Sequence, residues 1–149
     1  MKKIALLLLV AVLAGCVSIE KRLSNAAEKV IDLIDDGNSE DLIAMTSTPF
    51  LLDGEIIILD QDIADFWVAI IAAGFNVGSP VLVETVQADE ETFRQFAETK
   101  EVESYFQKYV TEECHLVIVE TEEIRLILIM DRPDKKNSRI IGLKGPIEL

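Results

Sequence analysis

The sequence has few residues of the kinds that carry most metal and nucleophile chemistry. It contains two cysteines and one histidine, so any histidine-based acid or base chemistry must use His115. It has no closely spaced cysteine pair for zinc, no calcium-binding loop and no glycine-rich loop of the type that cradles phosphate. We therefore expect no metal and no cofactor, and we assign no catalytic residue.

Basic charge is also scarce. The chain has 14 lysines and arginines against 27 aspartates and glutamates, a formal net charge of −13. A negative surface repels nucleic-acid phosphates and anionic lipid headgroups, so nucleic acid is not an expected partner. We interpret the acidity as a solvated face that keeps the domain in solution, with cation binding as the alternative.

The sequence lacks an apolar run long enough to remain as a transmembrane helix. Its longest run extends from Ile4 to Val17, whereas crossing the hydrocarbon core takes about 20 apolar residues. The run follows a short cationic start and ends in small residues, which is the layout of a secretory signal. We therefore expect a signal peptide over residues 1–15 and a single domain over residues 16–149, long enough for a hydrophobic core.

The stretch Leu13-Ala14-Gly15-Cys16 resembles the lipobox of bacterial lipoproteins at all four positions. In that family the cysteine thiol receives diacylglycerol, the peptide is cut just before it, and the new amino group is usually acylated. The resemblance implies that Cys16 is the lipid-bearing first residue of the mature protein, and two or more acyl chains anchor a protein stably to a membrane.

The residue after the lipidated cysteine bears on which membrane holds the protein. In Gram-negative lipoproteins an aspartate there commonly signals retention in the inner membrane, and this chain has Val17. The resemblance thus implies an outer-membrane anchor with the domain facing the periplasm. Anchoring to the plasma membrane of a single-membrane bacterium stays open as the alternative.

Cys114 is the second cysteine, and lipidation of Cys16 would leave it without a disulfide partner. The apolar residues that follow predict a buried strand with the thiol inside. The stretch Glu112-Glu113-Cys114-His115 also suggests a metal site or a thiol with a neighbouring base. Because successive side chains of a strand point to opposite faces, we expect Cys114 and His115 not to act together.

Several segments show the three- and four-residue apolar spacing of amphipathic helices. From Asp89 to Val110 the apolar face changes side, which predicts a break near Thr99-Lys100 and two short helices, or one kinked helix. The other predicted helices cover 18–36, with Gly37 as a C-terminal cap, 39 to about 45, started by Ser39, and 60 to 74, capped by Asp60 and stopped at Gly74.

Strands are predicted in the remaining apolar segments. Asp53-Gly54 lies between two apolar runs and predicts a tight hairpin with positive backbone angles at both positions. The strand around Leu126 is apolar on both faces, so it is covered on both sides or has core on one side and a pocket on the other. The predicted strands are 49–52 and 55–59 in the hairpin, then 80–87, 115–120, 122–130 and 139–143.

The order helix, helix, hairpin, helix, strand and then long strands resembles the NTF2-like fold, also called SnoaL-like or cystatin-like. The resemblance rests on this order and on the hairpin that feeds the helix starting at Asp60. It implies an α+β domain in which a curved, mainly antiparallel sheet forms a cone around helices and can leave an apolar cavity. Enzymes of this family generally use a carboxylate or histidine inside the cone. Tyr105, Tyr109 and His115 are conceivable pocket groups here, and no acid is identifiably inside.

The predicted function is a non-enzymatic, membrane-anchored envelope module that binds a small apolar ligand or an envelope protein. The alternative is a SnoaL-like cavity enzyme, an isomerase or hydrolase acting on a lipidic substrate. A buried carboxylate beside a tyrosine would favour the enzyme. Trp67, the only tryptophan, lies on the apolar face of its helix, and we expect a ligand in an adjoining cavity to change its emission.

Overall fold

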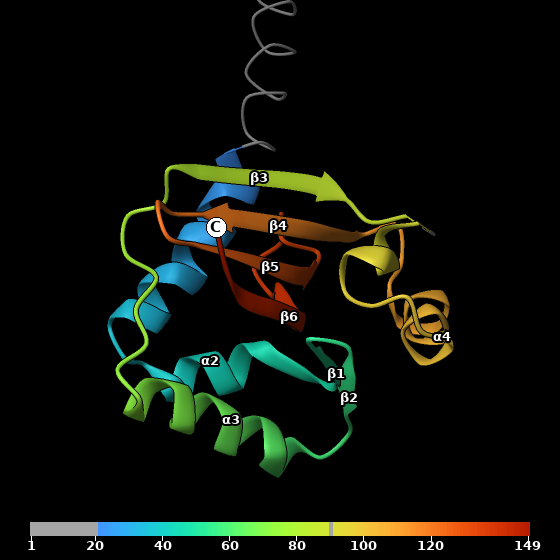
Figure 1. Ribbon diagram of the computed structural model, residues 1–149, viewed down its shortest axis with the longest axis horizontal. Helices are drawn as coiled ribbons and strands as arrows, with labels where there is room; N and C mark the ends of the chain where they lie inside the picture. The colour runs from blue at the N-terminus through green and yellow to red at the C-terminus, as the bar shows by residue number, and fades with distance from the viewer. Residues whose placement is uncertain (1–20, 90) are drawn as a thin grey trace, which may run out of the picture.

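The computed structural model describes residues 21–89 and 91–149. The signal peptide, the lipobox 13–16 and Val17 lie outside these residues. The described residues form an α+β domain with four α-helices, one 3-10 turn and one six-stranded sheet (Figure 1).

The N-terminal helix, described over residues 21–35, ends as its sequence predicts. Gly37 has a φ of +71°, a conformation that suits glycine because it has no Cβ. The amide of Gly37 donates to the carbonyl of Ile34 at 3.1 Å, and that of Asn38 donates to Leu33 at 2.9 Å. These two bonds satisfy carbonyls of the last turn and close the helix.

The next two helices begin where predicted but with different caps. α2 (Ser39–Met45) is capped by Asn38, whose side-chain oxygen accepts a backbone N–H of the first turn, so the expected cap at Ser39 is wrong. α3 (Asp60–Ala72) has no side-chain cap, because Leu59 holds the cap position, and the Asp60 carboxylate accepts the hydroxyl of Thr48 at 2.7 Å. The expected capping role of Asp60 is therefore also wrong.

The hairpin prediction is confirmed. β1 (Thr46–Leu52) pairs with β2 (Glu55–Ile57) in antiparallel fashion. Asp53 has a φ of +54° and Gly54 a φ of +125°, positive at both positions. β2 ends at Ile57, two residues before the expected end of the strand.

Replacing Gly54 by valine is expected to lower the free energy of unfolding by about 1 kcal/mol or more, because a β-branched residue is strained at this φ. A Cβ at this position would also lie 3.1 Å from the Cβ of Ala97. Thermal melts measure the effect. Glu55→Val, an exposed strand position one residue on, is the control and should melt like the wild type. A Gly54→Val protein that melts like this control would contradict the turn.

The sheet has the strand order β2-β1-β6-β5-β4-β3. β1 and β6 are parallel, and the other neighbouring pairs are antiparallel. The short strand β2 and the strand β3 are its two edges. The remaining strands are β3 (Leu82–Gln87), β4 (Cys114–Glu120), β5 (Ile124–Asp131) and β6 (Arg139–Glu148).

The predicted break in the segment 89–110 is confirmed. The 3-10 turn η1 (Thr92–Gln95) is followed by α4 (Lys100–Tyr109). The hydroxyl of Thr99 accepts the amide of Val102 at 3.3 Å and caps α4. The break lets two aromatic groups that would face opposite sides of one continuous helix pack into the same core.

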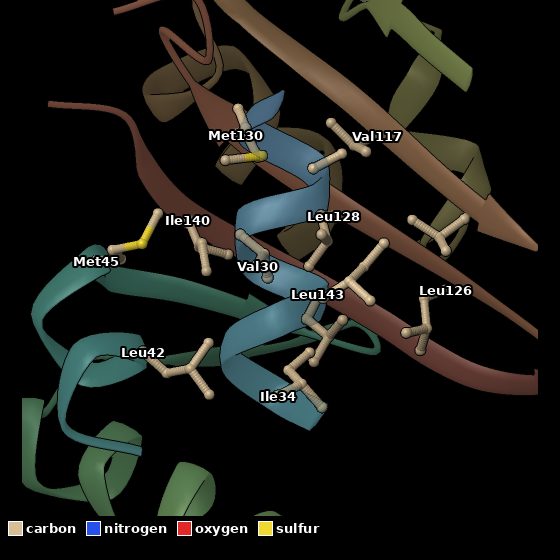
Figure 2. Close-up of a cluster of buried hydrophobic side chains, with 14 of the residues drawn as sticks. Val30, Ile34, Leu42, Met45, Val117, Leu126, Leu128, Met130, Ile140 and Leu143 are labelled. Atoms are coloured by element: carbon tan, nitrogen blue, oxygen red, sulfur yellow. The ribbon is translucent and has the colours of Figure 1, made fainter. Parts of the chain in front are cut away.

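Helices cover both faces of the sheet. On one face the N-terminal helix, α2 and α3 pack against alternate residues of β4, β5 and β6, as Figure 2 shows for Val30 and Ile34 beside Leu128 and Leu143. On the other face η1 and α4 pack against the intervening residues, such as Ile129. The apolar character of both faces, expected for β5, extends to β4.

The cone implied by the NTF2-like resemblance is corrected to an α+β sheet that is not strongly curled (Figure 1). The physical reason lies in β4 and β5, where consecutive residues such as Leu128 and Ile129 are both buried, on opposite faces. A sheet that is apolar on both faces needs helices on both faces. A sheet wrapped around one helix would leave its outer face uncovered.

Candidate functional site

Two of the three suggested pocket residues meet at one surface groove. Tyr105 and Tyr109 lie one turn apart on α4, with ring centroids 5.2 Å apart. Together with Pro49 of β1 and with Ile56 and Ile58 in and after β2, they line a groove of about 410 Å³. This volume lies in the range of small-ligand sites, and we call this site the β2 groove.

The β2 groove lies on the face of the sheet that η1 and α4 cover. We call the apolar cluster on this face the second core and the cluster under the N-terminal helix, α2 and α3 the first core. Ile56 pairs with Leu51, and paired residues of antiparallel strands point to the same face of a sheet. Leu51 is fully buried on the face covered by η1 and α4, whereas Ile56 is 38% exposed and Ile58 is 71% exposed. α4 thus lies beside β2 without covering it fully, and apolar side chains remain open there.

The hydroxyl of Tyr105 holds α4 against the sheet. It lies 2.6 Å from the carbonyl oxygen of Ile141 and 2.9 Å from that of Pro49, and it shares one proton between these two acceptors. Burial is the main cause that raises the pKa of this phenol. The hydroxyl therefore stays protonated and occupied, which suits a structural role better than acid–base chemistry.

Two lysines border the groove in an otherwise acidic chain. Lys100 and Lys108 line it from α4, together with one acid, Glu101. The ammonium of Lys108 lies 4.9 Å from the ring centroid of Tyr109, within the range of a cation–π contact. The rim is therefore locally positive, and it favours a neutral or acidic ligand.

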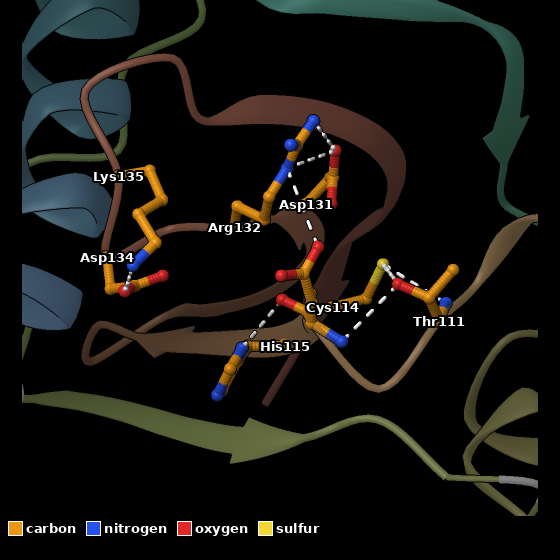
Figure 3. Close-up of polar contacts among 8 residues, drawn as sticks. Thr111, Cys114, His115, Asp131, Arg132, Asp134 and Lys135 are labelled. Atoms are coloured by element: carbon orange, nitrogen blue, oxygen red, sulfur yellow. Dashed lines mark hydrogen bonds and ion pairs between the residues drawn. The ribbon is translucent and has the colours of Figure 1, made fainter.

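Cys114 and His115 lie away from this groove and face opposite sides of the sheet. Cys114 is 1% exposed, its sulfur accepts the amide of Thr111 at 3.4 Å, and burial is the largest cause raising the pKa of the thiol (Figure 3). The Nδ1 atom of His115 lies 3.2 Å from the carbonyl oxygen of Glu113. The predicted burial of Cys114 and its separation from His115 are confirmed. In the described part of the chain no three His, Cys, Asp or Glu residues gather as metal ligands.

A second cleft, of about 570 Å³, lies between η1 and α4. Phe93 and Phe106 contribute aromatic surface to it, and their ring centroids are 6.4 Å apart. Asp89, Glu103 and Glu112 add acidic groups to the lining. The cleft is more polar than the β2 groove.

Trp67 belongs to the first core and lines neither of these two clefts. It is fully buried, and its indole N–H donates to the hydroxyl of Thr46 at 2.9 Å. The ring of Phe66 lies edge-on at a centroid distance of 5.0 Å. The expected burial is confirmed, and a ligand in the β2 groove would not touch the indole.

Buried acids are missing from the region that the structure describes. Within residues 21–89 and 91–149, the one buried polar side chain is Thr92, and no aspartate or glutamate is buried. The carboxylate beside a tyrosine that would favour a cavity enzyme is therefore not present among these residues.

With this geometry in view, the chain was compared with known proteins. No family model matches it, and no curated protein matches it either. Within the described ranges, no helix has the length and apolar character needed to cross a membrane.

Most residues of the β2 groove were not expected from the sequence, among them Ile56, Ile58, Lys100 and Lys108. The run 56–59 does carry a signal, because it consists of four consecutive apolar residues after a hairpin turn. Alternation puts half of them on each face of the sheet, so both faces of an edge strand must be covered to bury them all. No comparable signal marks the two lysines.

Proposed function

We propose that the protein is a lipid-anchored module of the bacterial cell envelope that binds an extended segment of another envelope protein in the β2 groove. Lipid on Cys16 would hold it at the outer membrane with the domain facing the periplasm. Membership in the bacterial lipoproteins is supported by the four lipobox residues. A relation to NTF2-like proteins is supported by the order of the elements alone.

The observation that carries the binding proposal is an open strand edge next to exposed apolar side chains. β2 is an edge of the sheet, so its outer backbone N–H and C=O groups can pair with another strand. A peptide added there would place alternate side chains against Ile56, Ile58 and Tyr109. Main-chain pairing favours a protein segment over a small apolar molecule.

The charges around the β2 groove restrict which peptide segments can bind there. Lys100 and Lys108 would attract an acidic group of the peptide, while the acidic remainder of the surface would repel acidic proteins elsewhere. The partner segment is therefore apolar at alternate positions and carries acid at its flank. A small apolar ligand is the second candidate, and the aromatic surface of the cleft between η1 and α4 favours it.

Ile58→Glu is expected to abolish partner binding without destabilising the domain. Its side chain is 71% exposed, and such surface changes usually stay within about 0.5 kcal/mol. A photo-crosslinking residue at position 58 in living cells should give one discrete envelope-protein adduct, and adding a second change, Ile56→Glu, should remove it. The matched control is a crosslinker at Val68, which is 52% exposed on α3 and outside the groove.

Equal adducts at positions 58 and 68, or an adduct that survives the Ile56→Glu change, would contradict the groove as the binding site. A hydrophobic dye bound equally by the wild type and the Ile58→Glu domain, with no adduct at position 58, would favour the small-ligand candidate instead.

A further inference from the structure

One groove collects basic residues in this acidic chain. It has a volume of about 500 Å³ and lies between the N-terminal helix and the turn that joins β5 to β6. Its charged lining residues are four basic and one acidic, namely Arg22, Lys29, Lys135, Lys136 and Asp134. We call it the basic groove. It reverses locally the net charge of −13 that the whole chain carries.

The N-terminal helix supplies two cations of the basic groove. Arg22 and Lys29 are seven residues apart, so they lie on the same face of the helix. Both line the groove, so this face of the helix carries its positive charge toward the turn that joins β5 to β6.

The turn side adds two more cations. The ammonium of Lys135 lies 3.0 Å from the carboxylate of Asp134, and this hydrogen bond is the main cause that lowers the pKa of the acid (Figure 3). Lys136 and Lys29 form no ion pair with another described residue. The basic groove thus keeps an excess of positive charge.

The position of the basic groove in the chain points to what it faces. Arg22 comes six residues after Cys16 in the sequence. A fully extended chain spans at most about 3.6 Å per residue, so Arg22 lies no more than about 22 Å from the lipid-bearing residue. A lipid on Cys16 would therefore keep this groove close to the membrane surface.

We infer that the basic groove contacts the headgroups of anionic phospholipids in the membrane that holds the protein. This inference rests on the proposed lipid anchor at Cys16. Each lysine or arginine near an anionic surface gains about 1 kcal/mol, and the attraction falls off within about 10 Å at moderate salt. The acidic remainder of the domain is repelled from the same surface, so the groove gives the tethered domain one preferred side toward the membrane.

Lysine labelling of the native lipidated protein tests this contact. The protein is reconstituted in vesicles of phosphatidylcholine alone or of phosphatidylcholine with phosphatidylglycerol, and reductive methylation rates are read by mass spectrometry. We expect Lys29, Lys135 and Lys136 to react about fivefold more slowly on the anionic vesicles, the change equivalent to about 1 kcal/mol per side chain. Lys100 and Lys108, in the β2 groove, are the matched controls and should keep their rates.

A double variant, Lys135→Glu with Lys136→Glu, should remove the protection of Lys29, and 0.5 M salt should do the same. If the protein attaches to both kinds of vesicle but Lys29, Lys135 and Lys136 are labelled equally on both, the proposed contact of the basic groove with anionic headgroups is refuted. The proposed lipid anchor at Cys16 is then unaffected. Failure of the protein to attach to either kind of vesicle would refute the anchor, and with it this inference.

Discussion

Replacing Trp67 by alanine is expected to lower the free energy of unfolding by about 3–5 kcal/mol, the range for truncating a large buried aromatic residue. Trp67 is fully buried between α3 and the sheet, and its removal would leave a cavity lined by apolar side chains. It would also remove the indole N–H that donates a hydrogen bond to the Thr46 hydroxyl. A small domain has about 5–15 kcal/mol of total stability, so this one change removes a large share of it.

Urea unfolding followed by far-UV circular dichroism measures the loss without relying on tryptophan emission. The control is Val68→Ala on the next residue of the same helix, which is 52% exposed and should change stability by no more than about 0.5 kcal/mol. Equal midpoints for the two variants would mean that Trp67 is not part of the packed core. In the wild type its emission should be blue-shifted, and hydrophobic ligands should leave it unchanged.

Local patterns predicted most of the elements because the deciding interactions are local. Gly37 ends its helix through bonds to the preceding turn, and Asp53-Gly54 sets the hairpin through its own backbone angles. The two caps were wrong by one residue, because Asn38 and Leu59 hold the cap positions. The carboxylate of Asp60 accepts a hydrogen bond from the hydroxyl of Thr48, twelve residues earlier. Such a contact leaves no pattern in the sequence around the start of the helix.

The arrangement of the sheet was beyond local patterns. The parallel pairing of β1 with β6 joins segments about ninety residues apart, such as Leu51 and Gly142. Apolar residues on both faces of β5 indicated cover on both sides or a pocket, and the sequence left these alternatives open. The helices that provide the cover come from the N-terminal half of the chain on one face and from the segment 92–109 on the other, so only the folded structure decides between them.

The candidate site was predicted only in part, again because residues far apart in the sequence form it. Tyr105 and Tyr109 were named as conceivable pocket groups from the resemblance to NTF2-like enzymes, and the structure brings them together in the β2 groove. Ile56 and Ile58 join them through the hairpin, a segment more than forty residues earlier. Burial of a residue depends on what covers it, and periodicity alone could not show that α4 leaves Ile56 and Ile58 exposed.

Substituting Cys16 by serine is expected to abolish lipid attachment completely. Serine has no thiol to alkylate. The resemblance to the lipobox family implies that the signal peptide is cut only after this alkylation. Metabolic labelling with an alkyne-bearing palmitate analogue measures the effect as loss of label from the protein. In the wild type, mass spectrometry of membrane-extracted protein should show a modified peptide that begins at Cys16 and no peptide from residues 1–15.

Cys114→Ser is the matched control, because Cys114 is the one other cysteine in the chain. Its thiol is 1% exposed inside the second core, so it is not available for acylation in the folded domain. The control should therefore keep its palmitate label and its place in the membrane fraction, where two or more acyl chains hold a protein stably. Label that persists in the Cys16→Ser protein would place the lipid elsewhere, and a wild type that carries none would remove the anchor from the proposed function.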